Sequence, residues 1–137
     1  MADPVRVRAE ILKEMLLHAR SEPEVECCGL LAGREGMITA NFPATNVLAS
    51  ATAYEIAPRE LFRLFRAMRE KELTHLGLYH SHPRGENVPS PRDIAQAYYS
   101  DQVYFIVSPR TGAPNPVRAF SIRGARVREL EIIAINS

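Results

Sequence analysis

Apolar positions in the first part of the chain switch between an alternating and a helical spacing. "VRVR", residues 5–8, alternates and predicts a short strand. Apolar residues then recur at three- and four-residue intervals over 9–21, which predicts an amphipathic helix that Pro23 ends. The apolar run "VECCGLLAG" (25–33) predicts a buried strand, and the turn "GREG" leads into a second strand, "MITANF" (37–42).

The pattern resumes after a less regular stretch in the middle of the chain. A helix is expected to begin at Pro58, because proline suits the first helical turn, and to end near Glu72. "HLGLY" (75–79) predicts a strand, which a Gly- and Pro-rich loop and a helix over 91–99 follow. "VYFIVSP" (103–109) predicts a central strand.

The chain closes with "PVRAFSI" and "VRELEIIAI", which predict two strands joined by a turn at Arg123 and Gly124. The resulting element order is β-α-β-β-α-β-α-β-β-β. Such an alternation predicts an α/β fold, in which helices pack on a mixed sheet. The 137 residues suit one domain spanning 1–137.

Composition narrows the classes of function. Hydrophobic residues make up 46% and charged residues 24%, which is typical of a soluble globular protein. The formal charge of +1 gives no indication of binding to nucleic acid or to an anionic membrane. No apolar run has the length of a membrane span. Cys27 and Cys28 are neighbours, and adjacent residues rarely reach disulfide geometry, so we expect buried, reduced thiols and a cytoplasmic location.

The segment "HSHPRGENVPSPRD", residues 80–93, holds the residues best suited to chemistry. In an extended segment, His80 and His82 point to the same side. If a helix begins at Ser90, Asp93 lies in its first turn and faces the same loop. Two histidines, one carboxylate and one open position are the general plan of a catalytic zinc site.

Two other interpretations remain open from the residues alone. Ser90 and Asp93 could form only a helix cap, because Ser-x-x-Asp resembles a capping box. Two histidines and a carboxylate also form the facial triad of non-haem iron enzymes.

An upstream carboxylate could complete the site. Glu26 lies at the beginning of the apolar run, where burial of a carboxylate is costly unless it is paired or used. It is either solvated at a frayed strand end or a general base whose pKa is raised by its apolar surroundings. Glu24 competes for the same role.

Taken together, these motifs resemble those of the JAMM, or MPN+, metalloproteases. The signature of that family is an upstream Glu, then His-x-His, seven residues, Ser, two residues and Asp, and every spacing fits over 80–93. The stretch "ECCGLLAG" resembles the family's Glu-x-Cys-Gly-Leu-Leu-x-Gly and favours Glu26 over Glu24.

The resemblance implies a fold and a set of roles. The fold would be a curved mixed β-sheet flanked by helices, similar to that of cytidine deaminases. His80, His82 and Asp93 would bind Zn²⁺, with a water as fourth ligand. Glu26 would act as general base and then general acid, and Ser90 would donate a hydrogen bond to the oxyanion of the intermediate.

The resemblance also implies a reaction. The chain looks like the compact, single-domain prokaryotic members, which hydrolyse peptide or isopeptide bonds. The expected substrate is a ubiquitin-like or sulfur-carrier protein, cut at its C-terminal Gly-Gly tail, with no nucleic-acid or membrane partner and with a homodimer left open. The alternative is a catalytically silent MPN-type scaffold, although all five signature positions are intact.

Overall fold

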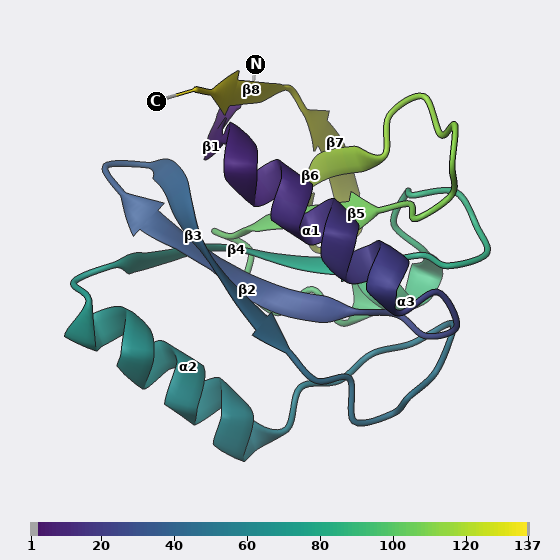
Figure 1. Cartoon of the computed structure of the whole chain (residues 1–137), viewed down its shortest axis with the longest axis horizontal. Helices are drawn as coiled ribbons and strands as arrows, with labels where there is room; N and C mark the ends of the chain where they lie inside the picture. The colour runs from purple at the N-terminus through teal and green to yellow at the C-terminus, as the bar shows by residue number, and fades with distance from the viewer. Residues whose placement is uncertain (1–2, 137) are drawn as a thin grey trace.

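A computed structural model gives the fold of residues 3–136, as seen in Figure 1. Helices and strands alternate through the first two thirds of the chain, and strands alone complete it. The elements are β1 (Val5–Arg8), α1 (Ala9–Ser21), β2 (Cys28–Arg34), β3 (Met37–Ala44), α2 (Pro58–Glu70), β4 (Thr74–Ser81), α3 (Pro91–Ala95), β5 (Val103–Val107), β6 (Val117–Arg123), β7 (Arg126–Leu130) and β8 (Ile132–Ile135).

All the strands belong to one mixed sheet, with the order β7-β6-β5-β4-β2-β3-β1-β8. The pairs β4–β5, β1–β3 and β1–β8 are parallel, and the other neighbours are antiparallel. β7 and β8 follow one another in sequence yet lie at opposite ends of this order, so the sheet curves strongly towards a barrel. The predicted α/β fold, a curved mixed sheet flanked by helices, is confirmed.

The prediction of one closing strand over 127–135 was wrong. The strand is interrupted at Glu131, so β7 pairs with β6 while β8 pairs with β1. The carbonyl oxygen of Glu131 accepts the N–H of Val5 at 2.8 Å, which fixes the crossing from one partner to the other. Leu130 and Ile132, on the two sides of the break, are both partly buried against the same core cluster, so the spacing of apolar residues does not reveal the break.

Two further boundaries differ from the sequence prediction. The helix expected over 91–99 ends at Ala95, and the N–H of Tyr99 donates to the hydroxyl of Tyr104 at 3.0 Å instead of to a helical carbonyl. The strand expected from residue 25 begins only at Cys28. Glu26 lies before it, and its N–H donates to the carbonyl of Ser50 at 2.8 Å.

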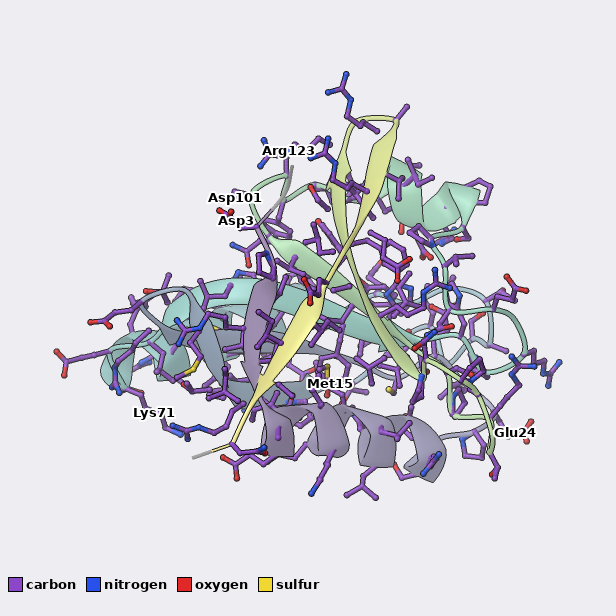
Figure 2. The ribbon with its side chains drawn as sticks, turned by 90° about the horizontal axis from the view of Figure 1, so that it is seen from above. Asp3, Met15, Glu24, Lys71, Asp101 and Arg123 are labelled. Carbon is purple, nitrogen blue, oxygen red and sulfur yellow. The ribbon has the colours of Figure 1, made fainter. Side chains whose placement is uncertain are left out.

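The helices α1 and α2 cover opposite faces of the sheet. Met15 of α1 is fully buried among sheet residues, and Figure 2 shows its place beneath the strands. Leu64 and Met68 of α2 pack on the other face, beside Leu78 of β4. Burying each of these side chains contributes roughly 1.5–3 kcal/mol to folding. His80, two residues after Leu78, therefore lies on the α2 side of the sheet.

The adjacent cysteines are free and buried, as predicted. Burial raises the pKa of both Cys27 and Cys28 to about 12, so neither thiol is a nucleophile near neutral pH. None of the helices within residues 3–136 is both long enough and apolar enough to cross a bilayer.

Candidate metal centre

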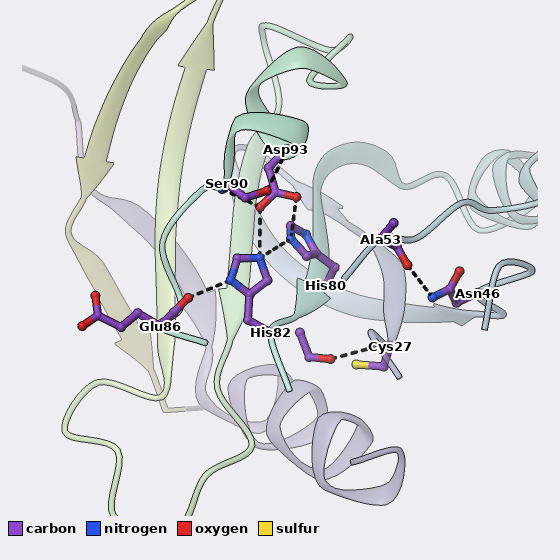
Figure 3. Close-up of polar contacts among 9 residues, drawn as sticks. Cys27, Asn46, Ala53, His80, His82, Glu86, Ser90 and Asp93 are labelled. Carbon is purple, nitrogen blue, oxygen red and sulfur yellow. Dashed lines mark hydrogen bonds and ion pairs between the residues drawn. The ribbon is translucent and has the colours of Figure 1, made fainter. Parts of the chain in front are cut away.

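The end of β4 and the start of α3 bring three predicted ligands together, as Figure 3 shows. His80 is held in register opposite Cys28 of β2 and Ile106 of β5. His82 follows the end of the strand, and its backbone N–H donates to the carbonyl of Val107 at 2.9 Å. The loop then returns so that Asp93, in the first turn of α3, faces both imidazoles.

The distances between the ligand atoms suit one small cation. The Nε2 atoms of His80 and His82 lie 3.2 Å apart. Asp93 Oδ2 lies 3.0 Å from His82 Nε2, and Oδ1 lies 3.2 Å from His80 Nε2. Tetrahedral bonds of roughly 2.0–2.1 Å would separate such atoms by roughly 3.3 Å. His80, His82 and Asp93 therefore form a group that could hold a metal ion.

The protonation states of these residues also suit a cation. Burial lowers the pKa of His80, which keeps its imidazole neutral. The Nδ1–H of His82 donates to the carbonyl oxygen of Glu86 at 2.7 Å. Burial acts to lower the pKa of His82, but its hydrogen bonds to Asp93 and to the Glu86 carbonyl raise it, so Nε2, 3.0 Å from Asp93 Oδ2, must give up a proton when a metal binds. Burial acts to raise the pKa of Asp93, but hydrogen bonds to both histidines and to the N–H of Ser90 hold it below its usual range. Neutral imidazoles and a carboxylate are the forms that bind metal.

Ser90 caps α3 and orients the carboxylate ligand. Its Oγ accepts the N–H of Asp93 at 3.1 Å, and its own N–H donates to Asp93 Oδ2 at 2.9 Å. These two bonds form a capping box, so Ser90 and Asp93 do cap α3. The hydroxyl proton of Ser90 takes no part in either bond, which leaves it free to donate to a substrate oxygen.

Glu26 is the buried carboxylate beside this group. Its side chain is close enough to His82, Asp93 and Arg92 for their charges to affect its pKa. It is only 3% exposed, and its Oε1 atom has no hydrogen-bond partner among residues 3–136. Burial raises its pKa to about 7, a rise that His82 and Arg92 partly oppose. Such a carboxylate can both accept and return a proton near neutral pH.

The competing carboxylate, Glu24, lies in solvent. Its side chain is 81% exposed and pairs with Arg84 at 3.5 Å. The structure thus places Glu26, and not Glu24, next to the group of His80, His82 and Asp93.

Sequence reasoning missed two residues that contact the site but are far from it in the sequence. Tyr54 stacks on His80 with ring centroids 4.7 Å apart. The amide of Asn46 donates to the carbonyl oxygens of Glu26 and Ala53, both at 3.0 Å, and so joins the 46–53 loop to the backbone of the buried carboxylate. Both residues lie in the stretch that appeared irregular in sequence, where no periodicity or motif distinguished them.

Comparison with known proteins identifies the family. The model of the prokaryotic homologs of the JAB domain matches residues 8–123, and the chain belongs to this family. It is 34% identical to a CysO-cysteine peptidase of Mycobacterium tuberculosis, over 90% of this chain and 86% of that protein. It is 34% identical to a desampylase of Haloferax volcanii, over 90% and 91%. A probable TtuB-protein conjugate cleaving protease of Thermus thermophilus is 37% identical, over 80% and 70%.

Solved structures agree with this membership. A solution structure of a Desulfitobacterium hafniense protein superposes with a TM-score of 0.84 at 32% identity, covering 96% of this chain and 93% of that one. A JAB1/MPN domain protein of Archaeoglobus fulgidus shares the fold, with a TM-score of 0.63 at 18% identity over 96% and 99%. The fold, the peptidase relatives and the His–His–Asp group make this chain a hydrolytic enzyme of the JAMM metallopeptidase class.

Proposed function

We propose that the protein is a Zn²⁺-dependent peptidase that cleaves the bond following the C-terminal Gly-Gly of a ubiquitin-like or sulfur-carrier protein. The observation that carries this proposal is the pairing of a buried carboxylate, Glu26, with the converging group His80, His82 and Asp93. A structural metal site would need no general base and would usually have four protein ligands.

His80, His82 and Asp93 would hold the ion, which supplies Lewis-acid activation of water and of the scissile carbonyl when bound. Glu26 accepts the proton of the attacking water and returns it to the leaving amine, a task that suits its pKa of about 7. Ser90 donates its free hydroxyl proton to the oxyanion that forms on the carbonyl carbon.

The substrate class rests on the relatives. One is named for CysO-cysteine, one as a desampylase and one for TtuB-protein conjugates, so all three names describe the release of a group from a protein. A flexible Gly-Gly tail suits such a site because an extended, side-chain-free segment can approach a sheet edge closely and pair with it through its main chain.

The test is cleavage of a sulfur-carrier protein extended beyond its Gly-Gly tail, followed by mass spectrometry, with zinc added and with chelator. Glu26→Gln should keep zinc and lose roughly 10²- to 10⁴-fold in kcat. Glu24→Gln, two residues away and exposed, is the matched control and should retain activity. Normal turnover by Glu26→Gln, or activity that Fe²⁺ supports and Zn²⁺ does not, would contradict the proposal.

A further inference from the structure

An aromatic pocket opens directly beside the metal-binding group. Its volume is about 200 Å³, and His80 and Asp93 form part of its wall. The floor comes from buried side chains of the sheet, and α2, the 53–56 segment and the 96–99 segment form the sides. The apolar and aromatic lining residues are Tyr54, Ile56, Leu61, Leu78, Tyr98, Tyr99, Tyr104, Ile106 and Ile122.

A Gly-Gly tail would leave this pocket empty. Glycine has no side chain, so the acyl side of the scissile bond needs close backbone approach and no apolar cavity. The cavity beside His80 and Asp93 is therefore better suited to the leaving group, which lies on the amine side of the scissile bond. Most of its lining is apolar or aromatic, which favours an apolar side chain as the occupant.

Arg92 gives the pocket one positive charge. It follows the α3 cap, lines the pocket, and lies near enough to Glu26 to affect that carboxylate. Within residues 3–136 its guanidinium forms no ion pair within 4.0 Å. The other charged groups in the lining are Asp93, which the two histidines engage, and Glu55 on the segment across from α3. Arg92 is exposed at the rim of the pocket, where its guanidinium can reach a carboxylate attached to an apolar body.

We propose that the pocket binds the leaving group as a single C-terminal amino acid with a large apolar side chain, and that Arg92 binds its α-carboxylate. This inference rests on the proposed function and specifies its substrate as carrier–Gly-Gly–X with a free terminal acid. The bond between the glycine carbonyl carbon and the nitrogen of X breaks. The oxygen of water joins the carbonyl carbon, and the protons complete the acid and the amine. An isopeptide-linked lysine, in contrast, presents no carboxylate at this distance from the bond.

The test compares carriers in which X is phenylalanine, leucine or alanine, each as the free acid and as the terminal amide. We expect kcat/KM for phenylalanine and leucine to exceed that for alanine roughly tenfold or more. The free acid should exceed the amide by about 10- to 100-fold, the range for a hydrogen bond to a charged group. L-phenylalanine should also inhibit competitively, and phenylalaninamide should do so more weakly.

Two variant pairs separate the pocket from general effects on catalysis. Arg92→Ala should bring the ratio of kcat/KM for the free acid to kcat/KM for the amide close to one. The absolute rate can also change, because Arg92 affects the pKa of Glu26, but that change is common to both substrates and leaves the ratio unaffected. Arg66→Ala, on the exposed face of α2, should leave the ratio unchanged. Leu61→Trp should narrow the pocket and remove the preference for phenylalanine over alanine, while Phe62→Trp, at a position that is 65% exposed, should not.

The outcomes distinguish a failure of the pocket assignment from a failure of the proposed peptidase function. Cleavage of every carrier at similar rates, with acid and amide equivalent, would overturn the pocket assignment and leave the proposed function standing. An absence of cleavage for all extended carriers, with zinc bound, would overturn both.

Discussion

Replacing Glu26 by glutamine is expected to stabilise the metal-free protein, by an amount that grows as the pH rises from about 4.5 to about 7. Burial raises the pKa of this carboxyl from its ordinary value of 4.5 to about 7. Between these values the native state binds more protons than the unfolded state, so stability falls as pH rises through that window. At about 1.4 kcal/mol per pKa unit, the whole shift corresponds to about 3 kcal/mol of folding stability. The wild-type protein has this stability while Glu26 is protonated and has lost it above about pH 7.

Glutamine has nearly the same shape and carries no charge, so it avoids this penalty. From pH 5 to pH 8, the free energy of unfolding of Glu26→Gln relative to wild type should rise by about 2.5 kcal/mol. Titrating groups far from Glu26 are common to both proteins and cancel in this difference; His82 does not, because the charge of Glu26 helps to raise its pKa. The burial of Glu26 and the unpartnered Oε1 atom are the structural cause.

Urea unfolding in the presence of chelator, at both pH values, measures this difference. Glu24→Gln makes the same change of charge at a side chain that is 81% exposed, and is the matched control. Added zinc should shrink the effect, since a nearby cation favours the ionised carboxylate. An equal stability difference at pH 5 and pH 8 would refute the reasoning, because it would mean that Glu26 titrates like an exposed carboxyl.

Three other substitutions test separate parts of the structure. His82→Ala should abolish metal retention, as measured by elemental analysis, and full zinc stoichiometry would remove this residue from the ligand set. Ser90→Ala should lower kcat by roughly 10²-fold and stability by roughly 1 kcal/mol; a loss of stability alone would leave capping as its role. Gly29→Ala should destabilise the fold by roughly 1–3 kcal/mol, because a Cβ there would lie 2.4 Å from the Tyr79 ring. Gly85→Ala, with open space around it, is the control in thermal unfolding, and equal melting temperatures for the two would contradict this packing argument.

The elements that sequence predicted well are those whose signal is local. Apolar spacing located the helices at 9–21 and 58–70 to within two residues, because each helix buries one continuous stripe on the sheet. The His80–Asp93 spacing was equally informative, since a strand end, a turn-rich loop and a helix cap restrict where its side chains can lie. The selection of Glu26, however, depended on family resemblance.

The features that could not be predicted from the sequence depend on contacts between segments far apart in the chain. The break at Glu131 lies within "VRELEIIAI", a run with no Gly or Pro to mark it, and the change of pairing partner from β6 to β1 separates β7 from β8. Tyr54 and Asn46 act through His80 and Glu26, which are 20 or more positions away, and no spacing rule connects them. The same holds for the pocket, whose walls come from six separate parts of the chain.

The central claim is that His80, His82 and Asp93 bind a catalytic zinc ion that works with Glu26. The most direct measurement is elemental analysis of the purified protein, combined with chelator-sensitive cleavage of a carrier protein extended past Gly-Gly. We expect close to one zinc per chain, with cleavage after Gly-Gly that chelator abolishes and zinc restores. A protein that retains no zinc after reconstitution, or that cleaves equally well in chelator, would contradict the claim.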